Sequence, residues 1–133
     1  MQAKRIDHVV IAVQDLDAAV ATYQRNFGLT KVSGGEVPSL GIRNAFLQIG
    51  EAQIELVTPL TKQGPVATFL DKHGEGMYLL ALEVDDLDAA IAQLQSQGTR
   101  VNVAEGSAGR RLAFVSPRAT HGVLLQLLER RAG

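Results

Sequence analysis

Residues 13–24 of this chain recur as residues 84–95, at an offset of 71 positions. The chain is therefore one structural unit written twice, and each half is too short to bury a core of its own. We predict a single domain over residues 1–133 in which both halves share the interior. Its expected parts are module 1 at about residues 5–60, a connector at 61–76 and module 2 at about 77–130.

Each half has the pattern of a β-α-β-β-β module. The first should contain strands at 6–13, 29–33, 44–49 and 52–57, with a helix capped by Asp15 or Asp17 and ended by Gly28. The second should contain strands at 77–84, 100–103, 110–116 and 122–128, with a helix at 86–97. Pro65 is suited to the first position of a short connector helix that ends near Lys72. The predicted fold class is α+β, with two tandem βαβββ modules forming a curved mixed sheet around a cleft.

Charge and composition restrict the function. The net charge of −1 without a block of like charges argues against a nucleic-acid or membrane-surface partner. There is no cysteine, hence no disulfide and no thiolate chemistry. Residues 1–7 lack the apolar core of a secretory signal, and no apolar run reaches about 18 residues. We expect a cytoplasmic protein whose ligand is a small molecule.

The repeat also locates a candidate site. Adding 71 to His8 gives Leu79, and adding 71 to Glu55 gives Gln126. Strand alternation puts Gln53 and Glu55 on one face of their strand and the neighbouring apolar residues on the other. If a pseudo-twofold axis relates the modules, the four positions related by the offset should converge in one cleft. We take His8, Gln53, Glu55, Leu79 and Gln126 as its ligand-binding lining.

Several motifs together resemble one known family, the vicinal oxygen chelate superfamily of glyoxalases, extradiol dioxygenases and bleomycin-resistance proteins. Within that superfamily they are most similar to the methylmalonyl-CoA epimerases. The resemblance covers residues 6–130. The motifs are Ile6-Asp7-His8-Val9, Glu36-Val37-Pro38 with Gly41, Ile54-Glu55-Leu56 with Pro59, Pro65 to Leu70 with Lys72, Gly74-Glu75-Gly76, and Ala113-Phe114 with Gly122-Val123-Leu124.

The resemblance implies a metal site with two departures. In the epimerases, a His, a Gln or Glu, a second His and a Glu hold the metal, at positions that fall here on His8, Glu55, Leu79 and Gln126. Leu79 has no lone pair, and the amide of Gln126 is a weak ligand and cannot act as a base. The implied metal ligands are therefore His8, Glu55 and Gln126. We expect binding of cobalt, zinc, nickel or manganese to be weak or absent.

Three functions remain open on this basis. The first is a small-molecule-binding protein that has altered or lost the metal-dependent activity. The second is an acyl-CoA or small-carboxylate epimerase or isomerase that uses Glu55 as its catalytic base. The third is other metal-dependent chemistry of the superfamily, which Leu79 would impair most. The resemblance and an exposed strand edge further predict a homodimer.

Specificity should depend on residues outside this site. We expect the loops at 33–42 and 105–109 to shape the ligand pocket. Basic side chains could meet the phosphates of coenzyme A; the candidates are Lys31, Arg43, Arg110 and Arg111.

Overall fold

The computed structural model describes residues 1–129. By its internal contacts the chain forms two compact units, residues 8–78 and residues 1–7 together with the chain from Leu79 onward. No helix within the described part is long and apolar enough to span a membrane. The single domain over 1–133 stays a prediction, and the predicted end of module 2 at residue 130 lies outside the described residues.

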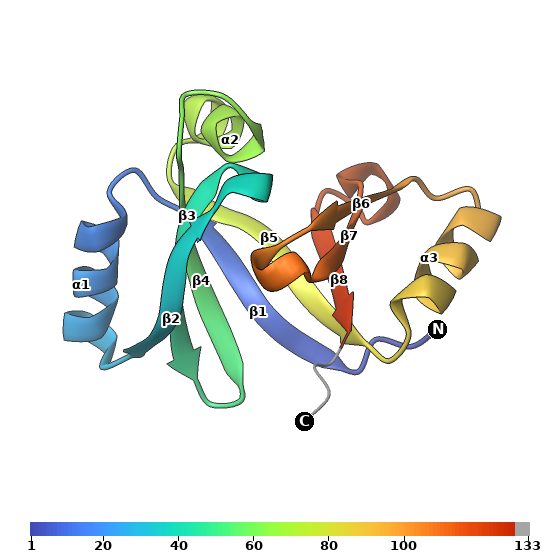
Figure 1. Ribbon diagram of the computed structural model, residues 1–133, viewed down its shortest axis with the longest axis horizontal. Coiled ribbons are helices and arrows are strands. Elements are labelled where there is room, and N and C mark those ends of the chain that lie inside the picture. Colours follow the sequence, from blue (N-terminus) through green and yellow to red (C-terminus); the bar gives the residue numbers. More distant parts are fainter. Residues whose placement is uncertain (130–133) are drawn as a thin grey trace. The chain divides into compact units, whose positions relative to one another are not determined.

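The unit of residues 8–78 holds a four-stranded mixed sheet with the strand order β2-β3-β4-β1. β3 pairs antiparallel with both β2 and β4, whereas β4 pairs parallel with β1. Helix α1 lies along one face of this sheet (Figure 1). The elements are β1 (Arg5–Ala12), α1 (Leu16–Phe27), β2 (Thr30–Val37), β3 (Ile42–Ile49), β4 (Ala52–Pro59) and α2 (Pro65–His73).

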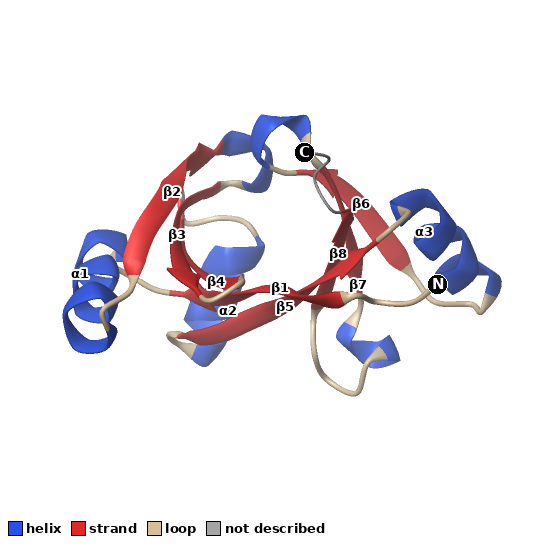
Figure 2. Cartoon of the chain, turned by 90° about the horizontal axis from the view of Figure 1, so that it is seen from below, coloured by secondary structure: helices blue, strands red, loops and turns tan. Residues whose placement is uncertain are grey.

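The second unit repeats this arrangement. β8 pairs parallel with β5 and antiparallel with β7, which in turn pairs with β6. Helix α3 contacts β6 and β8 of this sheet (Figure 2). The elements are β5 (Gly76–Val84), α3 (Leu87–Ser96), β6 (Val101–Glu105), β7 (Arg111–Val115) and β8 (Leu125–Glu129).

Equivalent aspartates begin the helices of the two modules. The Asp15 carboxylate accepts a hydrogen bond from the backbone N–H of Ala18 at 3.1 Å, and Asp86 accepts one from Ala89 at 3.0 Å. Each bond satisfies an N–H that the first helical turn leaves without an intrahelical partner. Of the two cap candidates for α1, the structure therefore selects Asp15.

The repeat extends to the packing of each interior. Leu16 of α1, Leu56 of β4 and Ala45 of β3 belong to the hydrophobic core of the first unit. Leu87 and Leu127, each 71 positions later, occupy the core of the second unit. Because the same positions are buried in both halves, the repeat is one of structure, and the predicted α+β class of tandem βαβββ modules is confirmed.

The main difference from the sequence-based expectation is in β2. We predicted a strand at 29–33 followed by a loop at 33–42, but β2 continues to Val37. Gly34 and Gly35 pair there with Ala45 and Asn44 of β3. A Cβ atom on Gly34 would lie 2.5 Å from the Asn44 carbonyl oxygen, so this approach of β2 to β3 requires glycine. The two glycines therefore belong to a strand, which their type alone does not indicate.

Candidate functional site

Glu55 is a buried carboxylate near the middle of β4, with 7% of its surface exposed. Its neighbours Ile54 and Leu56 contribute to the core beneath α1, so Glu55 lies on the opposite face of the sheet, as alternation predicts. One oxygen, Oε1, lies 3.1 Å from His8 Nε2. The other, Oε2, accepts a hydrogen bond of 2.9 Å from Asn44 Nδ2. A buried carboxylate requires such partners, because burying it without them would cost several kcal/mol.

His8 approaches Glu55 from the adjacent strand. β1 runs parallel to β4, with His8 in register with Gln53 and Val10 in register with Glu55. The His8 ring is buried and meets the Phe46 ring edge to face, with 5.7 Å between centroids. The predicted proximity of His8 and Glu55 is therefore confirmed.

Asn44 is a functional candidate that the sequence analysis missed. It lies on β3 and is buried, on the same face as Phe46 and Glu55. The signal was an amide beside Ala45, at the alternation that also places Phe46 on the site face. We refer to His8, Asn44 and Glu55 as the polar trio.

Gln53, predicted to line the ligand, lies at the β3–β4 hairpin end of this face. Its Nε2 donates to Gln48 Oε1 at 3.0 Å, and Gln48 in turn donates to the carbonyls of Gly50 and Ala52. Gln53 is thus part of a network that holds the turn together. Its role in ligand binding stays a prediction.

Leu79 and Gln126 belong to the second unit, and both are buried. Gln126 lies on β8 in register with Ala81 of β5 and with Phe114 of β7. Within the described part of the chain, Gln126 Oε1 has no hydrogen-bond partner. A buried acceptor without a donor is costly, so this oxygen is suited to a donor or cation supplied from outside the described residues. The predicted convergence of these two residues with His8 and Glu55 stays a prediction.

The polar trio fits a divalent metal in part. Protein nitrogen and oxygen ligands stand about 2.0–2.2 Å from such an ion, so two adjacent ligands of one ion are roughly 3 Å apart. His8 Nε2 and Glu55 Oε1 have this separation, at 3.1 Å. Asn44 would be an outer partner that orients the carboxylate, a role typical of metal sites. Among residues 1–129, no group of three or more His, Cys, Asp or Glu residues is arranged to hold a metal.

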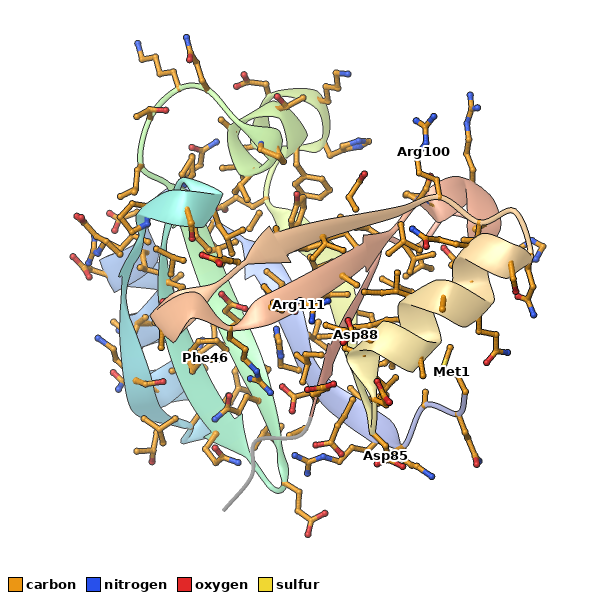
Figure 3. All side chains as sticks on the ribbon, turned by 45° about the vertical axis from the view of Figure 1, so that its right-hand side comes forward. Met1, Phe46, Asp85, Asp88, Arg100 and Arg111 are labelled. Carbon is orange, nitrogen blue, oxygen red and sulfur yellow. The ribbon has the colours of Figure 1, made fainter. Side chains whose placement is uncertain are left out.

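Two of the basic candidates form equivalent surface ion pairs. Arg43 Nη2 lies 2.6 Å from Asp17, and Arg111 Nη2 lies 2.6 Å from Asp88, which is 71 positions after Asp17. Figure 3 shows the second pair, between β7 and the start of α3. The hydrogen bond and charge of Arg111 lower the pKa of the Asp88 carboxyl below its usual range. Each arginine thus forms an ion pair between a strand and the first turn of a helix, which is a structural role.

A pocket of about 190 Å³ lies on the other side of the first sheet, between α1 and the strands β2 and β3. Lys31, Arg43 and Asp17 are among the residues that line it. Arg43 and Asp17 are paired with each other, whereas Lys31 forms no ion pair with any residue in 1–129. Asn44 of the polar trio is among the lining residues, but His8 and Glu55 are not, so we do not assign the pocket to the candidate site.

An aromatic cluster lies beneath α2. The ring of Tyr78 on β5 meets Phe69 edge to face, and Phe69 also contacts the ring of His73. Burial raises the pKa of the Tyr78 phenol above its usual value of 10.0. These ring contacts join α2 to Tyr78 within the first unit.

Comparison with known proteins identifies the class. Residues 7–114 match the Glyoxalase/Bleomycin resistance protein/Dioxygenase superfamily, and the chain belongs to that superfamily. Among its relatives, the ethylmalonyl-CoA/methylmalonyl-CoA epimerase of Cereibacter sphaeroides is 34% identical over 128 residues, covering 92% of this chain and 96% of that protein.

Solved structures agree with this relationship. Methylmalonyl-CoA epimerase from Mycobacterium tuberculosis has a TM-score of 0.91 at 39% identity, over 98% of this chain and 90% of that chain. A variant of the Streptomyces coelicolor methylmalonyl-CoA epimerase, in complex with 2-nitronate-propionyl-CoA, has a TM-score of 0.92 at 34% identity, over 98% of this chain and all of that one. The chain is therefore close to the methylmalonyl-CoA epimerases in both sequence and fold.

Proposed function

We propose that this protein binds an acyl-CoA thioester, that its divalent metal site is weak, and that its metal-dependent epimerase activity is slow or lost. Similarity to epimerases, one of them seen with a propionyl-CoA derivative, supports the ligand class. The set of candidate metal ligands supports the weak metal site and the slow or lost activity. His8 and Glu55 form a close buried pair, whereas Leu79 supplies no lone pair and Gln126 only a neutral amide.

A weak site follows from this donor set. His8 and Glu55 supply two strong donors, and Gln126 Oε1 is a third, weaker one. A metal bound there would polarise the thioester oxygen and stabilise the charge that develops when the α-proton leaves. Since a position that is His in the epimerases is here Leu79, we expect divalent ions to exchange readily with solvent.

Slow epimerisation follows from the chemistry of proton transfer. Inverting the carbon next to a thioester requires removal of a proton from one face and delivery of another to the opposite face. Gln126 cannot take part as a base, which leaves Glu55 as the carboxylate of the set. A carboxylate has roughly four acceptor positions. Asn44 occupies one of them and His8 Nε2 lies 3.1 Å from Oε1, so acceptor capacity remains for a ligand.

A second candidate function, an acyl-CoA or small-carboxylate epimerase or isomerase with Glu55 as base, is favoured by the same preorganised carboxylate. His8 and Asn44 hold Glu55 in one orientation, as a positioned base requires. The two functions share a ligand class and differ in turnover. Deuterium exchange at the α-carbon separates them.

Metal content and ligand binding test the proposal together. The purified protein, dialysed without added metal, should carry well under one equivalent of divalent ion and should still bind methylmalonyl-CoA in a calorimetric titration. Leu79→His should tighten cobalt binding, because it adds a strong ligand. Stoichiometric zinc, cobalt, nickel or manganese that survives dialysis would contradict the weak site. Absence of any heat with methylmalonyl-CoA would contradict the ligand class.

A homodimer and a cytoplasmic location are also part of the proposal. β2 is the first strand in the sheet order and is exposed along most of its length, which leaves an edge to which a second copy could add. Light scattering at micromolar concentration should give the mass of two chains. The mass of one chain would remove the dimer from the proposal.

A further inference from the structure

Asn44 has a task that similarity to the epimerases does not assign. It is buried on the site face, and its amide donates to Glu55 Oε2 at 2.9 Å. We propose that Asn44 is the positioning residue of Glu55, which fixes the carboxylate so that Oε1 is directed to His8 and to a bound ion or ligand. This inference rests on the proposed function, because it concerns the same site.

The need for a positioning residue follows from the carboxylate itself. The terminal torsion of a glutamate is broad and roughly two-fold, so a carboxylate held at one oxygen alone can rotate. Hydrogen bonds to charged groups correspond to roughly a tenfold to a hundredfold preference for the bonded state. With Asn44 on Oε2 and His8 at Oε1, one orientation of Glu55 dominates.

Asn44 is itself held from both sides. Its backbone is in register with Gly35 of β2 and with Val57 of β4. At Gly34 the two strands approach so closely that a Cβ would lie 2.5 Å from the Asn44 carbonyl oxygen. The Asn44 amide therefore starts from a fixed backbone, which is what a positioning group requires.

The second module shows that the fold does not need an amide here. Ala45 and Ala113 occupy equivalent core positions, so the counterpart of Asn44 on β7 is Leu112. Phe46 is in register with Glu55, and Phe114 with Gln126 in the same way. The module with leucine at this place leaves Gln126 Oε1 without a partner within residues 1–129. The amide is thus present in the module that has the carboxylate and absent from the module that has Gln126. Because the second module has leucine at this position, we expect Asn44→Leu to be compatible with the fold.

Side-chain amide signals test the hydrogen bond whether or not the protein binds metal. In a ¹H–¹⁵N spectrum, the Asn44 amide protons should exchange slowly with solvent and should shift in Glu55→Gln. The exposed amide of Asn102 serves as the matched control and should exchange quickly in both proteins. Exchange of Asn44 as fast as that of Asn102, or no response to Glu55→Gln, would overturn the proposal.

Cobalt binding then tests the consequence for the site. Loss of an outer partner typically weakens metal affinity by about 10- to 100-fold. We expect that loss in Asn44→Leu, with an altered visible spectrum of bound Co²⁺, and a similar loss in Gly34→Ala, which keeps the amide but displaces its backbone. Asn102→Leu should bind as the wild type does. Wild-type affinity and spectrum in Asn44→Leu would refute the positioning role. Lack of cobalt binding by the wild type would instead count against the metal site of the proposed function, and the amide spectrum would still decide the role of Asn44.

Discussion

Replacing His8 by leucine removes one of the two partners of a buried carboxylate. His8 and Glu55 side chains are 5% and 9% exposed, so little water can take the place of the imidazole. A hydrogen bond to a charged group contributes about 1.5–3 kcal/mol, and breaking a buried pair costs about 3–5 kcal/mol. Because Asn44 still binds Oε2, we expect His8→Leu to lower the free energy of unfolding by about 2–4 kcal/mol.

A second substitution isolates the cause. In the His8→Leu background, Glu55→Gln removes the buried charge and keeps a carbonyl oxygen that can accept from Asn44. It should restore about 1 kcal/mol or more of the free energy of unfolding, because residues in contact are not additive. The assay is urea unfolding at pH 7 with unchanged slope.

Two results would refute this reasoning. One is a loss below about 0.5 kcal/mol in His8→Leu, the size expected at an ordinary surface position. The other is a double variant whose loss equals the sum of the two single losses, since that would show that His8 and Glu55 do not interact.

Three further predictions concern the scaffold. Asp15→Ala and Asp86→Ala should each lower the free energy of unfolding by about 1 kcal/mol in urea, because each removes an equivalent helix cap. Since Arg111 lowers the pKa of Asp88, the ion pair stabilises the fold at neutral pH, and this contribution is lost as pH falls through the folded-state pKa. Arg111→Gln should raise the titration midpoint of Asp88 measured by NMR. An unchanged midpoint would show that the two side chains do not form an ion pair. Because burial raises the pKa of Tyr78, the phenol ionises at lower pH in the unfolded chain than in the folded one, so the stability of the fold should decrease as pH rises above 10.0. In thermal unfolding, the melting temperature of Tyr78→Phe should decrease less steeply over this pH range than that of the wild type.

Much of the fold could be predicted because the residues that repeat in the sequence are the ones that pack in the core of each module. Leu16 and Leu87 begin their helices in equivalent positions, and both are buried. The extent of β2 could not be predicted, since Gly34 and Gly35 have a low intrinsic strand preference. They are in the strand because β3 approaches closely there, which is a tertiary effect.

The site could be predicted in part for a related reason. Alternation, the offset of 71 and the resemblance to the epimerases together predicted that His8 lies near Glu55. Asn44 was missed because that offset leads to Val115, whereas its true counterpart is Leu112. The modules differ in length before β7, so one offset cannot relate every strand. Hydrogen-bond partners across strands depend on register, which sequence spacing alone does not determine.

Exchange of the α-proton of methylmalonyl-CoA with deuterated water, followed by NMR beside the Cereibacter sphaeroides epimerase, tests the central claim most directly. General-base catalysis contributes about 10²- to 10⁴-fold, and Gln126 cannot supply it. We therefore predict epimerisation at least about 10²-fold slower than by that enzyme, with any residual exchange abolished by Glu55→Gln. Epimerisation at the rate of the comparison enzyme, unchanged in Glu55→Gln, would contradict the account.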